Sequence, residues 1–325
     1  MMDGVSQWHV TEAGAATAVH VGQGPHLLDM HAPGYVWLHV DVAQEGARGW
    51  LEEAGLDPLV LRALLAPETR PRCTVHGDGV LMNLRGVNLN PGDEVEDMIS
   101  LRMWITEKLV MSVQLRQLRA VADVMAGFER GQGAEHPAEL VARLALRLAD
   151  RAEPVVAELN EKVDVLEDQL IDGGVPASRF DLANVRRVSI MLRRHMAPQR
   201  DALSTFEIEE MAWIAPEGRA RLREATERMT RLAEELDAIR DRAQVVQDQI
   251  MDARAETMNQ QMLILSVVAA IFLPLGLITG LLGINVGGVP GTQYGGSFWI
   301  VTLALAIIGG LLFIWFRSLG LLGRK

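Results

Sequence analysis

Two long apolar runs stand close together near the end of the chain. Met262 to Leu282 (MLILSVVAAIFLPLGLITGLL) has no charged residue, and neither has Phe298 to Phe316 (FWIVTLALAIIGGLLFIWF). As helices these runs would be about 31 Å and about 28 Å long, which matches the roughly 30 Å hydrocarbon core of a bilayer. Trp299 and Trp315 lie near the two ends of the second run, where interfacial aromatic side chains are favoured. The pattern predicts two transmembrane helices in a lipid bilayer rather than two buried core helices.

Apolar residues three and four positions apart predict long helices from Ala138 onward. The first helix should end at the DGGVP sequence that begins at Asp172, and Pro198 should kink or interrupt the second. The apolar positions of the first helix are Val156, Leu159, Val163, Leu166 and Leu170, and those of the second are Leu182, Val185, Leu192 and Met196.

A third helix should begin at Pro216 and continue into the first apolar run, because no helix breaker occurs before Pro274. Continued to Leu282, it would be about 100 Å long at the helical rise. Its apolar seam consists of Leu222, Ala225, Met229, Leu232, Leu236, Ile239, Ala243, Val246, Ile250 and Ala253. This spacing fits packing against the two preceding helices and fits a coiled coil with a neighbouring subunit equally well.

Residues before the long helices mix strand-like and helical patterns. The runs beginning at Tyr35 (YVWLHVDV), Gly79 (GVLMNLRGV) and Ser100 (SLRMWITEKLVMSVQ) predict strands, and those beginning at Ala47 (ARGWLEEAGL) and Pro58 (PLVLRALL) predict helices. Turn-rich stretches are 22–25, 91–93 and 131–137. The fold class expected is an α+β/α membrane protein with an N-terminal α/β cytoplasmic domain, a long helical stalk and two C-terminal transmembrane helices. Its expected parts are 1–135, a helical and stalk region 136–261, membrane helix 262–282, external loop 283–297, membrane helix 298–316 and a basic tail 317–325.

Charge is distributed unevenly along the chain. No acidic residue follows Glu256, and Arg317, Arg324 and Lys325 are the only charged residues after it. The part up to Glu256 therefore holds 28 of the 31 basic residues and all 42 acidic ones, a net charge of −14. Such a body suits cations better than nucleic acid, whose phosphates are bound through concentrated Lys and Arg.

The same charges predict the orientation in the membrane. The connection between the two runs is uncharged and basic residues follow the second run, so we expect both termini in the cytoplasm of a bacterial-type inner membrane. An N-terminus without a signal-peptide pattern and the single Cys73 fit this placement.

Motifs for enzymatic chemistry are missing from the sequence. It has no P-loop, dinucleotide fingerprint or nucleophile elbow, which argues against an ATP-driven pump and against an enzyme. Cys73 and His76 have a C-x-x-H spacing, but in a strand they would point to opposite faces, so we interpret them as a structural cysteine and a surface histidine. The other histidines, 9, 20, 26, 31, 39, 136 and 195, have no metal-site spacing and are expected to be surface or packed residues. We expect no cofactor.

The end of the first apolar run resembles the signature of the CorA-type divalent metal ion transporters. Phe272 to Gly291 reads FLPLGLITGLLGINVGGVPG, with Gly283, Ile284 and Asn285 where that family has Gly-Met-Asn. The isoleucine, the NVGGVPG sequence and RRHMAPQRD at 193–201 resemble the ZntB branch. The resemblance covers essentially the whole chain.

The resemblance implies a homopentamer with an axial pore lined by the first membrane helices. It makes Gly283, Ile284 and Asn285 the filter at the outer mouth, through which a divalent metal ion, Zn²⁺ in the ZntB branch, passes partly hydrated. Carried over without gaps, it places Asn259, Met262, Leu273 and Gly276 on the pore-facing stripe.

Continued down the stalk, this stripe reaches Glu234, Asp241, Asp248 and Asp252. We expect them to form acidic rings that concentrate cations in a cytoplasmic funnel, the alternative being a solvated helix face.

One departure from the family bears on the transported ion. Magnesium-type members have an acidic residue after a proline in the outer loop, whereas this chain has Pro290 followed by Gly291 and no acid in the loop. The sequence therefore favours zinc over the rival hypothesis of a magnesium, cobalt or nickel channel.

A membrane-anchored coiled-coil scaffold without transport function is the alternative from another class. Membrane helices without ionisable residues also disfavour proton coupling through a carboxylate in the bilayer.

Overall fold

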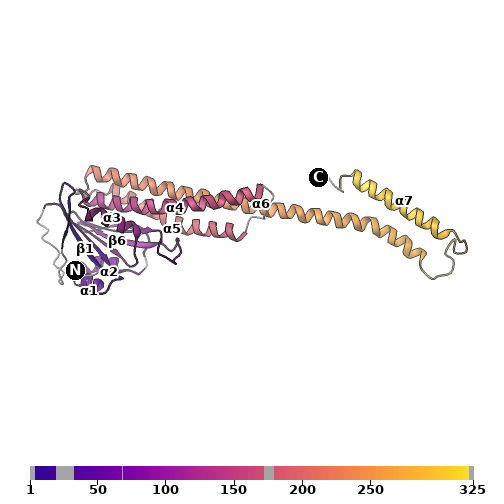
Figure 1. Ribbon diagram of the computed structural model, residues 1–325, viewed down its shortest axis with the longest axis horizontal. Helices are drawn as coiled ribbons and strands as arrows, with labels where there is room; N and C mark the ends of the chain where they lie inside the picture. Colours follow the sequence, from indigo (N-terminus) through magenta and orange to yellow (C-terminus); the bar gives the residue numbers. More distant parts are fainter. Residues whose placement is uncertain (1–3, 20–32, 68, 172–178, 322–325) are drawn as a thin grey trace. The chain divides into compact units, whose positions relative to one another are not determined.

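The computed structural model describes residues 4–19, 33–67, 69–171 and 179–321. The chain divides into two compact units, Met1–Gln247 and Asp248–Lys325. The first unit contains a sheet and helices packed on it, and the second contains the two apolar helices (Figure 1). This is the predicted fold class.

A seven-stranded sheet organises the first unit, in the order β2-β1-β3-β7-β6-β5-β4. Its strands are β1 (Val5–Val10), β2 (Ala16–Val19), β3 (Tyr35–Asp41), β4 (Arg72–His76), β5 (Gly79–Gly86), β6 (Ile99–Ile105) and β7 (Leu109–Gln114). Only β3 and β7 pair in parallel, with Trp37 opposite Val110, and the other neighbours are antiparallel. The run beginning at Ser100 is divided between β6 and β7 by a turn in which Leu109 O accepts from Thr106 N at 2.8 Å.

One face of the sheet is covered by the short helices α1 (Ala47–Glu53) and α2 (Pro58–Leu65). Alternate residues of β3 point to this face, and Val36, Leu38 and Val40 join Trp50 and Leu64 in one apolar cluster. Helix α2 begins where it does because the Asp57 carboxylate accepts from Leu59 N at 2.7 Å and from Val60 N at 3.4 Å.

The opposite face of the sheet is covered by α3 (Arg119–Glu129) and by the long helices α4 (Pro137–Ile171) and α5 (Arg179–Ile208). Trp8 and Trp37 are directly opposite each other on β1 and β3, and their rings stack at 4.8 Å. Phe128 of α3 meets Trp37 edge-on at 4.4 Å between ring centroids. Because β3 is buried on both faces, its apolar run is almost continuous.

Helix α6 (Pro216–Leu282) has the predicted bounds and belongs to both units. In the first unit it runs beside α4 and α5 (Figure 1), and its seam from Leu222 to Ile250 is buried inside the single chain. Ala253 is exposed, so the buried seam ends before this predicted member. The apolar seam therefore packs against the two preceding helices, as one of the two interpretations of its spacing predicted. A coiled coil with a neighbouring subunit is not needed to bury these positions.

Polar contacts fix the order of the long helices. Arg242 of α6 binds Asp164 and Glu167 of α4, each at 2.5 Å, and Arg193 of α5 binds Asp237 of α6 at 2.5 Å. Of the prediction that Pro198 kinks or interrupts its helix, the interruption is wrong, because α5 is continuous through Pro198, and the kink stays a prediction. Buried residues on both sides of the proline, among them Met196 and Ala202, keep the chain helical by packing. The predicted stop at Asp172 lies outside the described residues.

Candidate ion pathway

The apolar helices of the second unit bury almost none of their surface within the chain. The C-terminal part of α6 and α7 (Ser297–Ser318) both have the length and hydropathy to cross a membrane, and 6% and 0% of their most apolar windows are buried. Leu273 is 73% exposed and Trp299 is 73% exposed. Exposed apolar surface of this extent requires lipid or other copies of the chain around it.

Two glycines leave the backbone of the membrane part of α6 accessible to a neighbouring group. A Cβ atom added at Gly276 or at Gly280 would meet nothing within 4 Å. Between them the Thr279 hydroxyl shares its one proton between Leu275 O and Gly276 O, both at 3.1 Å, so its donor is used within the helix. This surface would let another helix or a hydrated ion approach the backbone.

Gly283, Ile284 and Asn285 stand where α6 ends. Gly283 N donates to Thr279 O at 2.9 Å, and a Cβ at Gly283 would lie 3.0 Å from the same carbonyl oxygen. Ile284 is 50% exposed and Asn285 is also exposed. Within the described residues the Asn285 side chain has no hydrogen-bond partner, so its amide oxygen is available to a ligand.

The rest of the connection is a compact loop with its own hydrogen bonds. Gly288 and Gly291 have φ angles of 103° and 86°, which favour glycine. The Ser297 hydroxyl donates to Gly291 O at 2.6 Å and joins the loop to the start of α7. Ile284, Asn285 and Val286 take no part in these contacts and are exposed.

The four residues predicted to line a pore all lie on α6. Asn259, Met262, Leu273 and Gly276 are exposed in the single chain, with Met262 at 54%. At 3.6 residues per turn these four residues and Gly283 fall within about 120° of one another around the helix. Their role as pore lining stays a prediction.

The four acidic residues predicted for the funnel, Glu234, Asp241, Asp248 and Asp252, are also exposed positions of α6. Two of them have partners in the chain. Arg240 donates to the Asp241 carboxylate at 2.8 and 2.9 Å, and Asp248 also makes an interaction within the chain. Part of the negative charge of this stripe is therefore offset locally, and the funnel stays a prediction.

Cys73 and His76 lie on β4, where the sequence places them. Burial and the nearby Glu209 raise the pKa of the Cys73 thiol to about 12, so it is protonated at neutral pH. His76 Nε2 lies 3.6 Å from the Asp57 carboxylate. In the described part of the chain, no three His, Cys, Asp or Glu side chains gather as a metal site.

The fold and the ion pathway together define a class of protein. An α/β domain is joined by one continuous helix to a membrane hairpin whose first helix ends in a Gly-x-Asn turn. The family model described as "CorA-like Mg2+ transporter protein" matches residues 33–318. The chain belongs to this family of membrane transporters.

Relatives of this chain include a divalent cation transporter and zinc transport proteins. The chain is 39% identical over 289 residues to "Divalent cation transporter CmaX" of Pseudomonas aeruginosa, covering 88% of this chain and 86% of the relative. It is 35% identical over 282 residues to "Zinc transport protein ZntB" of Pectobacterium carotovorum, covering 86% of both.

Solved structures have the same architecture. A structure of the full-length CmaX protein matches with a TM-score of 0.81 at 35% identity over 98% of each chain. The CorA magnesium transporter from Methanocaldococcus jannaschii matches with a TM-score of 0.79, also over 98% of each chain, and at 16% identity this likeness concerns the fold alone.

Proposed function

We propose that this chain is a divalent cation transporter that moves Zn²⁺ through a pore lined by the membrane part of α6. The observation that carries the proposal is the exposed Gly283–Ile284–Asn285 turn at the end of a membrane helix in a member of the CorA-like family. A scaffold would have no need for a free amide at this position. Support for zinc comes from the relatives named ZntB and from the outer loop without an acid.

The pore requires several copies of the chain. Two helices cannot enclose a water-filled path, and the apolar surface of α6 and α7 is uncovered in one chain. We infer a homopentamer, as the family resemblance implies, with the glycine surface of α6 turned toward the pore or a neighbouring helix. Native mass spectrometry of the detergent-solubilised protein counts the subunits, and a monomer would contradict the pore.

The filter would act through neutral dipoles. A ring of Asn285 amide oxygens attracts a cation but holds it less strongly than carboxylates, so at least part of the hydration shell is retained. Both termini and the acidic first unit lie in the cytoplasm under this proposal, because basic residues flank the inner end of α7.

Metal flux into proteoliposomes tests the choice of ion. The purified protein is reconstituted, and entry of Zn²⁺ and of Mg²⁺ is followed with ion-selective dyes, with and without a pH gradient. We expect Zn²⁺ entry to exceed Mg²⁺ entry at equal concentration. Magnesium flux with little zinc flux would instead establish the magnesium, cobalt or nickel channel, and no flux of either ion would favour the scaffold.

A further inference from the structure

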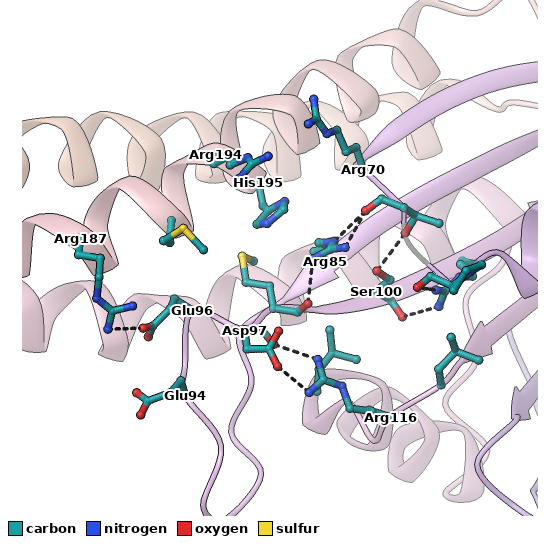
Figure 2. Close-up of a pocket in the computed structure, with 17 residues that line it drawn as sticks. Arg70, Arg85, Glu94, Glu96, Asp97, Ser100, Arg116, Arg187, Arg194 and His195 are labelled. Carbon is teal, nitrogen blue, oxygen red and sulfur yellow. Dashed lines mark hydrogen bonds and ion pairs between the residues drawn. The ribbon is translucent and has the colours of Figure 1, made fainter. Parts of the chain in front are cut away.

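A pocket in the first unit is lined by arginines, although the chain is acidic overall. It has a volume of about 750 Å³ and is lined by residues of α5, β5 and β6 and of the segments 69–70 and 94–98 (Figure 2). This volume is within the range of roughly 300–1,000 Å³ that is usual for small-molecule sites. The charged residues of its lining are Arg70, Arg85, Arg102, Arg116, Arg187 and Arg194 against Glu94, Glu96 and Asp97.

The acidic residues are concentrated on one side of the pocket. Arg116 donates to Asp97 at 2.8 Å, and Arg187 lies 2.7 Å from the buried Glu96 carboxylate. In Figure 2 these two pairs lie at the lower and left edges, away from Arg70 and His195. They neutralise their own arginines, and among the described residues the other side of the pocket carries Arg70, Arg102 and Arg194 without a paired carboxylate.

Arg102 supplies fixed positive charge to the pocket, and Arg85 lines the pocket with it. Arg102 is 2% exposed and donates to Ala66 O at 2.7 Å, and Arg85 donates to Thr69 O at 2.7 Å and to Met98 O at 3.1 Å. For Arg102, backbone carbonyls satisfy the donors without cancelling the charge. Burial, together with Arg85, lowers the pKa of Arg102 to about 10, so the side chain stays protonated at neutral pH.

The opposite wall carries Arg194 and His195 of α5, with Arg70 beside them (Figure 2). Among the described residues, no carboxylate forms an ion pair with Arg70 or with Arg194. The His195 Nδ1 atom is buried and has no hydrogen-bond partner in the described structure. Burial and the nearby Arg85, Arg194 and Arg70 lower the pKa of His195 to about 4, so the ring is neutral at neutral pH.

We propose that this pocket binds a small phosphorylated anion, with its phosphate group held between Arg70, Arg194 and His195. Guanidinium groups bind phosphate oxygens through two parallel hydrogen bonds, and a phosphate dianion offsets more of the excess positive charge than a single carboxylate. The remaining volume accommodates an organic group on the phosphate. Arg194 and His195 belong to the 193–201 segment, and the proposed pore uses none of it.

Calorimetric titration of the full-length protein in detergent micelles tests the proposal without any ion flux. The titrants are inorganic phosphate, adenosine monophosphate and citrate in a phosphate-free buffer without divalent metals. We expect saturable binding of phosphate or of the monophosphate at one site per chain. Arg194→Gln should weaken binding about tenfold, because a charge-assisted contact is lost.

Arg200→Gln is the matched control, since Arg200 lies on the same helix, is not part of the pocket lining and pairs with its neighbour Asp201. It should bind like the unmodified protein. Arg70→Gln serves as a second test if Arg194→Gln lowers the melting temperature.

The titrants separate the sources of the phosphate group. Tighter binding of the monophosphate than of inorganic phosphate supports a phosphorylated metabolite, and equal binding supports free phosphate as the ligand. Tighter binding of citrate than of both would overturn the phosphate assignment. Absence of binding, or equal weakening by Arg200→Gln, would overturn the pocket as a site.

Discussion

At the scale of single residues, His39 shows how the sheet controls a titratable group. Its side chain is 3% exposed, and its Nδ1 lies 2.9 Å from the Ser112 hydroxyl, which also accepts from Trp37 Nε1 at 2.9 Å. Burial lowers the pKa of His39 to about 4, with a smaller opposite effect from Asp41. The imidazole is therefore neutral in the folded protein at every pH above that value.

This shift predicts a loss of stability in weak acid. Because the folded pKa is depressed, the unfolded state takes up a proton first as pH falls below about 6.5, and stability declines until pH reaches about 4. A shift of this size amounts to about 2–3 kcal/mol in unfolding free energy between pH 7 and pH 4.5. Denaturant unfolding of the full-length protein followed by tryptophan fluorescence measures it.

His195, whose pKa is also lowered to about 4, titrates in the same window, so His39→Gln should remove about half of the total dependence. The matched variant His136→Gln should keep all of it. Asp57 and Asp97, whose pKa values are lowered by Leu59 N–H and by Arg116 respectively, lose their contribution below about pH 4, outside this window. Equal pH dependence in all three proteins would contradict the assignment to His39.

The sequence left His39 and His195 indistinguishable from ordinary surface or packed histidines. Their environments come from residues far away along the chain, Ser112 for one and Arg70 and Arg85 for the other. Periodicity does not encode such contacts, so the arginine-lined pocket could not be found from spacing. Gly283, Ile284 and Asn285 could be singled out because they adjoin one another in the sequence and follow a membrane run.

At the scale of elements, α6 is the helix on which the transport proposal depends. One face of it is buried against α4 and α5, as Leu236 and Ile239 are, while the acidic residues of the predicted funnel are exposed. The spacing of Asp241 and Asp248 is seven residues, which keeps them within about 20° of each other around the helix. They would form stacked rings in an oligomer.

Reversing the charge of Asp241 and Asp248 together to lysine should lower Zn²⁺ entry about tenfold, because the local cation concentration falls. The matched control reverses Glu224 and Glu235, which are exposed on α6 roughly 100° or more around the helix from the stripe. Flux assays in proteoliposomes compare the two double variants. Unchanged flux in the Asp241 and Asp248 variant would mean that this stripe is a solvated face.

Elements with strong periodicity could be predicted well, and weak ones could not. The bounds of α6 follow from Pro216 and the membrane run, whereas β1 carries polar Gln7 and His9 and β2 has four residues. Both lie at one side of the sheet, where β2 pairs with β1 and β1 pairs with β3, and they depend on this pairing rather than on their own pattern. Pro198 wrongly predicted an interruption of α5, because packing around this helix outweighs the cost of a proline within it.

At the scale of the whole molecule, the chain combines an acidic body with a membrane hairpin that is uncovered on its own. The apolar surfaces of α6 and α7 fit lipid on one side and neighbouring copies on the other, and the Asn285 amide has no partner within the described chain. Family membership, architecture and this free amide all fit an oligomeric pore for divalent cations.

Zn²⁺ entry into proteoliposomes containing the Asn285→Ala variant tests this account most directly. Gln293→Ala is the matched control, because Gln293 is exposed in the same loop but lies outside the Gly283–Asn285 turn. We expect Asn285→Ala to lower Zn²⁺ entry at least tenfold, since loss of a hydrogen-bonding or ion-binding dipole from every subunit acts on the same ion, while Gln293→Ala transports like the unmodified protein. Equal Zn²⁺ entry in both variants would contradict a filter at Asn285 and with it the proposed pore.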